Sequence, residues 1–376
     1  MTEETQGPDM YDVVVVGAGA AGVGVGVTLQ QAGIENFVIL ERHKVGGSFS
    51  LWPDETCFIT PSFPTNSVGM LDLNAVALGT SPAFSLGVEH PTGYEYAAYL
   101  DAVVRYFELP VRENTTVMRI TKVGDDFRVD TAEDTIRGKH VIWAAGEFQY
   151  PLLSGFEGSE LCRHTATIPT YSELKGDNYI IIGGYESGVD AAYHLVYQGK
   201  RVRVFDKECP WESQSSDPSV SLSTYTLERM REDWFEEQVE LFPNTGIVSV
   251  TQADDTYEVA TADGEIFHTK TQPLLAGGFE GSLKLISYLF ESREDGFPLL
   301  SENDESTITP GLFLCGPMVR HENHVFCFIY KFRQRFAVVA KAIATSLGLP
   351  AERLEEYRNW GMYLDDLSIC GEECLC

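Results

Sequence analysis

The sequence has few basic residues and no long apolar run. Its 376 residues include 27 lysines and arginines against 56 aspartates and glutamates, which gives a net charge of -29. A surface with this charge repels nucleic acids and anionic membranes, so we expect neither as a partner. No apolar run reaches the roughly 18 residues of a membrane span, and the first ten residues are polar and acidic, unlike a signal peptide. These absences predict a cytoplasmic protein.

The sequence also lacks the dense cysteine pattern of a disulfide-stabilised protein. Its eight cysteines are scattered along the chain, which in a cytoplasmic α/β protein favours catalytic, metal-binding or buried thiols over a disulfide framework. The acidic surplus is typical of proteins adapted to high salt, and we treat a halophilic source as a hypothesis. At this length the chain can form two or three domains with separate cores.

The first informative feature that is present is a glycine-rich motif near the start. An apolar run, Val13–Val16, leads into Gly17, Gly19 and Gly22, and a second apolar run ends at Glu41. The first glycine permits a tight turn, the second lets a pyrophosphate approach the backbone, and the third packs a helix against a strand. The phosphates would lie at the helix N-terminus, and Glu41 would accept hydrogen bonds from a ribose. The motif predicts a dinucleotide site, with an ordinary glycine-rich turn as the alternative.

A second copy of this motif lies in the middle of the chain. A strand-like run ends at Gly183, and Asp206 follows 23 positions later, against an interval of 24 in the first copy. The middle glycine is replaced by Tyr185, whose side chain would occupy the space of a pyrophosphate. Three outcomes stay open: the side chain swings aside, Gly184 serves in a shifted turn, or the site holds NADH or NADPH poorly. If a nicotinamide cofactor binds, Asp206 favours NADH.

Further stretches resemble one protein family. The chain is similar to the pyridine nucleotide-disulfide oxidoreductase superfamily, in its thioredoxin-reductase-like and flavin-containing-monooxygenase-like branches, at Gly46-Gly47 with Trp52, His90–Gly93, Val141–Pro151 and Thr309–Pro317. The resemblance implies an α/β fold with two Rossmann-like domains that bind FAD and NAD(P), each carrying a β-meander insertion. FAD is the first cofactor expected, and NADH or NADPH is a second whose site Tyr185 disturbs.

This layout divides the chain into four parts. Residues 1–153 and 301–350 would form a discontinuous FAD-binding domain, 154–300 an NAD(P)-binding-like domain, and 351–376 a cysteine-bearing tail. The motifs and the resemblance together assign cofactor binding to Gly17, Gly19, Ala20, Ala21, Gly22, Glu41, Arg42, Gly46, Gly47, Ser48, Trp52, Ala145, Gly146, Gly183, Gly184, Glu186, Ser187, Asp206, Gly316 and Pro317.

The late flavin motif differs from the family pattern. The family uses a glycine-aspartate pair to hold the ribityl chain, whereas this sequence has Gly316-Pro317. The next helix, expected from about Phe326 to Leu347, would direct its positive N-terminus at the flavin. His324 precedes it and is a candidate proton donor, with a surface histidine as the alternative. Five basic residues against one acidic residue within 317–341 predict either a basic island for an anionic partner or a solvated helix face.

The last seven residues hold three cysteines, Cys370, Cys374 and Cys376. Two close thiols can form a disulfide and thereby carry two electrons between a flavin and an external oxidant. Flavoprotein disulfide reductases with redox-active C-terminal cysteines resemble this arrangement. The three thiolates could instead ligate a soft metal ion, or be incidental. The acidic tail could dock on the basic island of its own or a neighbouring subunit, so a homodimer is among the expected assemblies.

Together these features predict an FAD-dependent oxidoreductase that acts on a small thiol or disulfide or on a redox protein, with the tail cysteines as the electron path. No resident metal ion is assigned. A flavin monooxygenase is the alternative, because Phe156, Gly158 and His164 approximate that branch's FxGxxxH signature; a flavoprotein whose tail binds metal is the third. Cys57 is the internal thiol that could reach the flavin, although a buried structural role is the simpler reading, and the thiols expected to be packing residues are Cys209, Cys315 and Cys327.

Overall fold

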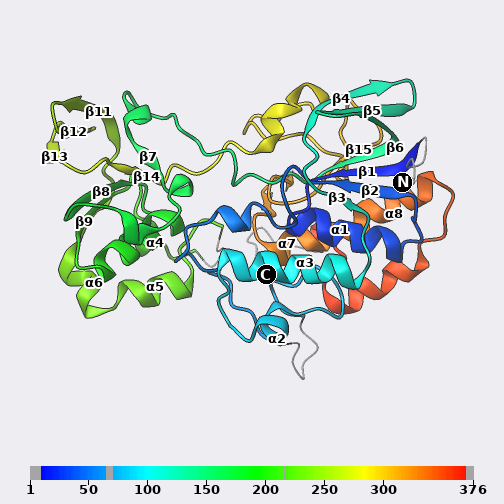
Figure 1. Cartoon of the computed structure of the whole chain (residues 1–376), viewed down its shortest axis with the longest axis horizontal. Coiled ribbons are helices and arrows are strands. Elements are labelled where there is room, and N and C mark those ends of the chain that lie inside the picture. The colour runs from blue at the N-terminus through cyan, green and yellow to red at the C-terminus, as the bar shows by residue number, and fades with distance from the viewer. Residues whose placement is uncertain (1–9, 65–70, 216, 218, 370–376) are drawn as a thin grey trace, which may run out of the picture.

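Two units, each built on a parallel sheet, lie side by side along the long axis of the molecule (Figure 1). The computed structural model describes residues 10–64, 71–215, 217 and 219–369. Among these described residues, no helix combines the length and the apolar character that are needed to cross a membrane.

The first unit is a seven-stranded sheet in the order β3-β2-β1-β6-β5-β4, with β15 paired to β6. Its strands are β1 (Tyr11–Val16), β2 (Phe37–Leu40), β3 (Val111–Arg112), β4 (Val117–Val123), β5 (Asp126–Thr131), β6 (Thr135–Trp143) and β15 (Leu312–Leu314). Strands β4, β5 and β6 form the antiparallel meander, while β1 pairs in parallel with β2 and β6. Because β15 follows the whole second unit in sequence, the first unit is discontinuous, as predicted.

Strand β1 is central because it is apolar on both faces. Val14 pairs with Val38 on one side and Val141 on the other, and all three are almost fully buried. The helices of this unit are α1 (Ala20–Gln31), α2 (Pro82–Leu86), α3 (Gly93–Tyr106), α7 (Ile329–Phe332) and α8 (Phe336–Ser346). Helix α1 packs closely on α8, since a Cβ atom added at Gly24 would lie 2.2 Å from the Phe336 ring.

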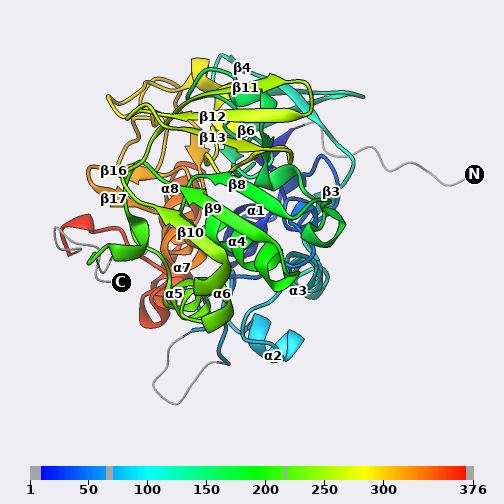
Figure 2. The same ribbon diagram turned by 90° about the vertical axis from the view of Figure 1, so that its left-hand side faces the viewer.

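The second unit repeats the strand-helix-strand arrangement on a smaller scale. Its five parallel strands run in the order β10-β9-β8-β14-β7, beside a separate antiparallel meander of β11, β12 and β13 (Figure 2). The elements are β7 (Arg163–His164), β8 (Asn178–Ile182), α4 (Glu186–Tyr197), β9 (Arg201–Phe205), α5 (Thr224–Met230), α6 (Asp233–Gln238), β10 (Val239–Phe242), β11 (Ile247–Ala253), β12 (Thr256–Thr261), β13 (Ile266–Thr269) and β14 (Leu274–Leu275). The two meander insertions are therefore present in the expected places.

The segment after β15 differs from its prediction. A short hairpin, β16 (Arg320–His321) with β17 (His324–Val325), precedes α7, and a 3-10 turn separates α7 from α8. The expected continuous helix from Phe326 is thus divided. The predicted basic island is also wrong as a surface feature, because its central members Lys331, Arg333 and Arg335 are at most 4% exposed.

Each of these three buried cations is held by partners inside the protein. The Lys331 ammonium donates to Asp217 and Ser219, and the Arg333 guanidinium donates to three main-chain oxygens of the segment 72–75. Arg335 forms an ion pair with Asp304, which is fully buried. Their charges therefore fix loops onto the helical segment and are not offered to an external anion.

Candidate active site

A cavity of about 700 Å³ lies between the two units. Its wall includes the turn after β1, the loop 47–60, the start of β4, the crossover 143–150 and the segment 327–332 from the first unit. The second unit contributes Thr165, Ala166, Tyr171 and the first turn of α4. The cavity is thus placed at the carboxyl ends of β1 and β6, where α/β sheets bind their ligands.

The first glycine turn has the shape that a dinucleotide requires. Gly17 has φ +103°, and an added Cβ atom there would lie 2.6 Å from the Ala144 oxygen. A Cβ atom at Gly22 would lie 1.8 Å from the Gly17 oxygen, so this glycine is needed for the close packing of α1 on the turn. Gly19, by contrast, has nothing within 4 Å of such an atom. Its open side faces the cavity, which leaves room for a phosphate at the N-terminus of α1.

Glu41 is fixed at the end of β2 by main-chain donors. Its two carboxylate oxygens accept hydrogen bonds from the amides of Ala18 and His43, both at 2.8 Å. The side chain is 7% exposed and lines the cavity. A carboxylate has about four acceptor positions, so two bonds leave capacity for ribose hydroxyls.

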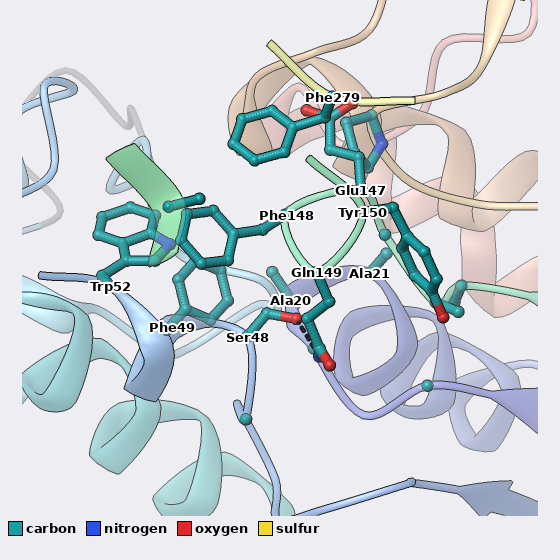
Figure 3. Close-up of a pocket in the computed structure, with 18 of the residues that line it drawn as sticks. Ala20, Ala21, Ser48, Phe49, Trp52, Glu147, Phe148, Gln149, Tyr150 and Phe279 are labelled. Carbon is teal, nitrogen blue, oxygen red and sulfur yellow. Dashed lines mark hydrogen bonds between the residues drawn. The ribbon is translucent and has the colours of Figure 1, made fainter. Parts of the chain in front are cut away.

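Gln149 closes part of the cavity because it forms hydrogen bonds with two residues of the loop after β2. Its amide donates to the Ser48 hydroxyl at 2.8 Å (Figure 3). Its oxygen accepts from Arg42. Arg42 also donates to the Tyr150 hydroxyl at 3.3 Å. Neither Gln149 nor Tyr150 was identified from the sequence; the only available signal was their position just after the small-residue crossover.

Aromatic side chains form the other wall (Figure 3). Ring centroids are 5.4 Å apart for Phe49 and Trp52, 6.1 Å for Trp52 and Phe148, and 5.4 Å for Phe148 and Phe279. Such a continuous apolar surface excludes water from a planar ligand. Phe279 belongs to the segment that follows β14, so this wall joins both units.

Fourteen of the predicted cofactor residues line this cavity, and six do not. Those in the wall are Gly17, Gly19, Ala20, Ala21, Glu41, Arg42, Gly47, Ser48, Trp52, Ala145, Gly146, Glu186, Ser187 and Pro317. Gly22 and Gly46 support the turn from behind, and Gly316 packs on Ala21, where an added Cβ atom would lie 3.2 Å from the alanine methyl. Gly183, Gly184 and Asp206 lie at the second glycine turn instead. The cradle at Gly19 and the size of the cavity fit FAD.

The second turn does not present the same open face. Gly183 and Gly188 repeat the geometry of Gly17 and Gly22, with φ +106° at Gly183 and an added Gly188 Cβ atom 1.9 Å from the Gly183 oxygen. The middle position, however, carries Tyr185, whose hydroxyl donates to a carboxylate oxygen of Glu208 at 2.7 Å.

Two acidic residues of the cavity wall, Glu147 and Asp190, were missed from the sequence. Glu147 follows the small residues of the crossover and lines the wall (Figure 3). Burial raises the pKa of its carboxyl, and the Arg320 charge only partly opposes this. Glu147 can therefore hold a proton nearer neutral pH than an exposed glutamate.

Two cysteine thiols also line the cavity. Burial, with the Asp190 charge, raises the pKa of Cys57 to about 11. Cys327, expected as a packing residue, lies in the wall instead, and its thiol donates to the Ser219 hydroxyl at 3.1 Å. Lys331 donates to the same hydroxyl at 2.9 Å. Burial raises the pKa of Cys327, while Ser219, Lys331 and Arg320 lower it.

Of the predicted catalytic residues, the structure describes only His324. His324 is in β17, with its Nδ1 atom 3.2 Å from the His321 oxygen, and it is not part of the cavity wall. Its catalytic role stays a prediction. Cys370, Cys374 and Cys376 lie outside the described residues. Within the described part of the chain, no cluster of three or more potential ligands could hold a metal ion.

Comparison with known proteins identifies the family. The family model described as pyridine nucleotide-disulphide oxidoreductase matches residues 14–316. The chain belongs to this family. An uncharacterized oxidoreductase, CzcO of Bacillus velezensis, is 29% identical over 191 residues, which cover 50% of this chain and 52% of the relative. The chain thus spans about half the length of the curated relatives that it matches in this way.

Two solved structures share the fold of this chain over nearly its whole length. The bacillithiol disulfide reductase Bdr from Staphylococcus aureus has a TM-score of 0.70 and 19% identity, covering 90% of this chain and 99% of that chain. A flavin-containing monooxygenase from Stenotrophomonas maltophilia has a TM-score of 0.69 and 17% identity, covering 90% and 100%. The predictions of the superfamily and of the two-sheet α/β architecture are confirmed. The oxidoreductase activity and the FAD cofactor stay predictions.

Proposed function

We propose that this member of the pyridine nucleotide-disulphide oxidoreductase family reduces or forms a disulfide bond in a small thiol compound or a redox protein, with FAD as its cofactor. The observation that carries the proposal is a cavity that fits FAD at the Gly19 turn and has the Cys327 thiol in its wall beside a buried lysine. The thiolate is the reactive form in disulfide exchange. The Ser219 hydrogen bond and the Lys331 and Arg320 charges act to lower the pKa of Cys327, but burial outweighs them and leaves that pKa raised. The similarity to the bacillithiol disulfide reductase supports the same substrate class.

The tail cysteines are the proposed carriers of electrons between the cavity and the substrate. The chain just before them is anchored beside the cavity wall, because the Leu364 amide donates to the Gln334 oxygen at 3.0 Å and Arg335 donates to the Leu364 oxygen. Gln334 is two residues beyond Phe332, which lines the cavity. The described chain continues from Leu364 to a short 3-10 turn, Leu367–Ile369, which directly precedes Cys370 in the sequence.

The proposed disulfide exchange uses two tail thiols, so that each S–S bond formed is matched by one that breaks. One tail thiolate attacks the substrate disulfide, which forms a mixed disulfide and releases the first substrate thiolate. The second tail thiolate then releases the other substrate thiolate and leaves a disulfide in the tail. The Gly19 turn and the cavity wall would hold FAD, whose reduced form would supply the two electrons that return the tail disulfide to two thiols.

The test replaces Cys374 and Cys376 together by serine. The variant is expected to keep its FAD and to lose at least 90% of its turnover with small disulfides. Cys209→Ser, at a half-buried position away from the cavity, is the control and is expected to turn over like the unmodified protein. Unchanged turnover in the double variant would rule out the tail as the electron path.

A flavin monooxygenase is the second candidate because of one observation at the junction of the units. His164, in the Phe156-Gly158-His164 segment, is buried and bonded to the Gly278 oxygen at 3.0 Å, and a monooxygenase from Stenotrophomonas maltophilia has the same fold. Oxygen uptake matched one to one by oxidised substrate would favour this function.

A tail that binds a soft metal ion is the third candidate. Stoichiometric metal in protein purified under reducing conditions would support it.

A further inference from the structure

The two glycine turns of the chain are copies in backbone geometry. Gly19 precedes α1 with φ -80° and ψ -167°, and Tyr185 precedes α4 with φ -80° and ψ -169°. Each helix is twelve residues long. Residue 185 therefore holds the place in the second turn that Gly19 holds in the first, and its side chain leaves the backbone in the direction that is open at Gly19.

The acidic residues after the next strands are also equivalent. Glu41 accepts hydrogen bonds from the amides of Ala18 and His43, both at 2.8 Å. Asp206 accepts from the amides of Gly184 and Glu208, at 2.6 and 2.8 Å. The groove between turn and acid, where a pyrophosphate and ribose would lie, can thus be compared directly between the two copies.

In the second copy this groove is crossed by a side chain of the protein itself. The Tyr185 hydroxyl donates to a carboxylate oxygen of Glu208 at 2.7 Å. The ring therefore extends from the glycine turn to the residue two positions beyond Asp206. Burial, together with the Glu208 contact, raises the pKa of Tyr185 to about 12, so the hydroxyl remains a donor throughout the physiological range.

Trp211 covers the other part of the turn. A Cβ atom added at Gly184 would lie 2.4 Å from the Trp211 ring, so the indole rests on the main chain of the turn. The ring also packs against the apolar core of the second unit, on a 3-10 turn that spans Pro210–Glu212. A pyrophosphate at this place would displace an indole that is already packed, and it would bring negative charge beside Asp206 and Glu208.

We infer that Tyr185 and Trp211 close the second dinucleotide site, so that the protein takes neither NADH nor NADPH there. The sequence left three outcomes open for Tyr185. The inference corresponds to the third, in which the site holds NADH or NADPH poorly. Asp206 makes the same two main-chain bonds as Glu41, so the inferred closure rests on Tyr185 and Trp211 and not on this carboxylate. The inference does not depend on disulfide chemistry and extends the proposed function only by excluding one class of electron donor.

The experiment measures dinucleotide binding directly on the FAD-loaded protein. Equilibrium dialysis with NADP⁺ and NAD⁺ at up to 1 mM, a concentration chosen to exceed ordinary affinities (about 1 μM–1 mM), is expected to show no saturable binding to the unmodified protein. Tyr185→Gly with Trp211→Ala is expected to bind one of the two at least tenfold more tightly. Tyr197→Ala, at the opposite end of α4 with a 75% exposed ring, is the control and is expected to behave as the unmodified protein.

Hydrogen exchange of the unmodified protein provides a second readout that needs no variant to fold. Dinucleotide added at 1 mM is expected to leave the exchange of residues 183–211 unchanged. Saturable binding by the unmodified protein, or protection of those residues, would overturn the inference. A double variant that retains FAD and still binds no dinucleotide would also overturn it, because the two side chains would then not be what closes the site. Loss of disulfide turnover in the tail variants would leave this result unaffected.

Discussion

Thr56 donates its hydroxyl hydrogen to Asp190 at 2.7 Å, and this bond joins the first unit to helix α4 of the second. Asp190 also accepts from Arg229 at 2.9 Å and lies 3.3 Å from the His194 ring nitrogen. Next to it, Glu55 accepts from the amides of Tyr171 and Ser172. The short segment 54–57 therefore attaches the cavity wall of one unit to the core of the other.

Replacement of Asp190 by asparagine should weaken this junction strongly. The change leaves Arg229, which is 9% exposed, without its ionic partner, and breaking a buried pair costs about 3–5 kcal/mol. Thr56→Val removes one neutral donor to a charged group and should cost about 1.5–3 kcal/mol. Urea denaturation measures both values, and an Asp190→Asn cost below that of Thr56→Val would contradict the assignment.

The Asp190 carboxylate should make the stability of the protein depend on pH. Burial acts to raise the pKa of Asp190, but the hydrogen bond and charge of His194 and the charge of Arg229 hold it below its ordinary value. The contribution of the Asp190 carboxylate to the free energy of unfolding is therefore complete above its pKa in the unfolded chain, about 4. This contribution is lost as the pH falls through the lower pKa of the folded protein. Melting temperatures measured from pH 6 downward should fall less steeply for Asp190→Asn than for the unmodified protein.

Two glycine substitutions in α1 and its N-cap should separate binding from folding. Gly19→Ala places a methyl group in open space, so the free energy of unfolding of the flavin-free protein should change by less than about 1 kcal/mol while FAD occupancy falls at least tenfold. Gly24→Ala forces a methyl group against Phe336 and should cost about 1–3 kcal/mol. Flavin absorbance per protein and urea denaturation provide the two readouts. Full FAD occupancy in Gly19→Ala would exclude the proposed cradle.

Cys57 should react slowly with alkylating reagents at neutral pH. Burial and the Asp190 charge raise its pKa to about 11, so the thiolate is a minor species at pH 7 and increases about tenfold per pH unit towards that value. Mass spectrometry of iodoacetamide-treated protein should show this rise between pH 7 and 10. A rate at pH 7 equal to that of a free thiol would contradict the result.

The ion pair between Arg335 and Asp304 should contribute more to stability than any exposed pair nearby. Arg335 is 1% exposed and Asp304 is fully buried, so Arg335→Met should destabilise the fold by about 3–5 kcal/mol. Lys341→Met, which breaks an exposed pair with Glu355, should cost less than about 1 kcal/mol. Similar costs for the two variants would show that the cluster is not buried in solution.

Much of the fold was predictable because it depends on local rules. The first glycine motif and Glu41 specify a strand, a turn and a helix within thirty residues, and Gly183 with Asp206 marks the repeat. The resemblance also pointed to Gly47, Ser48 and Trp52, which line the candidate FAD cavity. These features depend on the spacing of residues along the chain, which can be read from a single sequence.

The remaining features depend on contacts between distant segments. Lys331, Arg333 and Arg335 read as a basic helix face, and only the partners at Asp217, at segment 72–75 and at Asp304 show that they are buried. The direction of the Tyr185 ring likewise depends on Glu208, 23 residues away. Spacing cannot indicate which carboxylate or carbonyl group will meet a given cation or hydroxyl.

The attachment of the two units on both sides of the cavity has a consequence for how the molecule melts. The segment 54–57 joins them on one side, and Lys331 with Asp217, at 2.8 Å, joins them on the other. Neither sheet can come apart without exposing the partners of these buried charges. Heating in a calorimeter should therefore produce one cooperative endotherm for both sheets, with no separate transition for the smaller one.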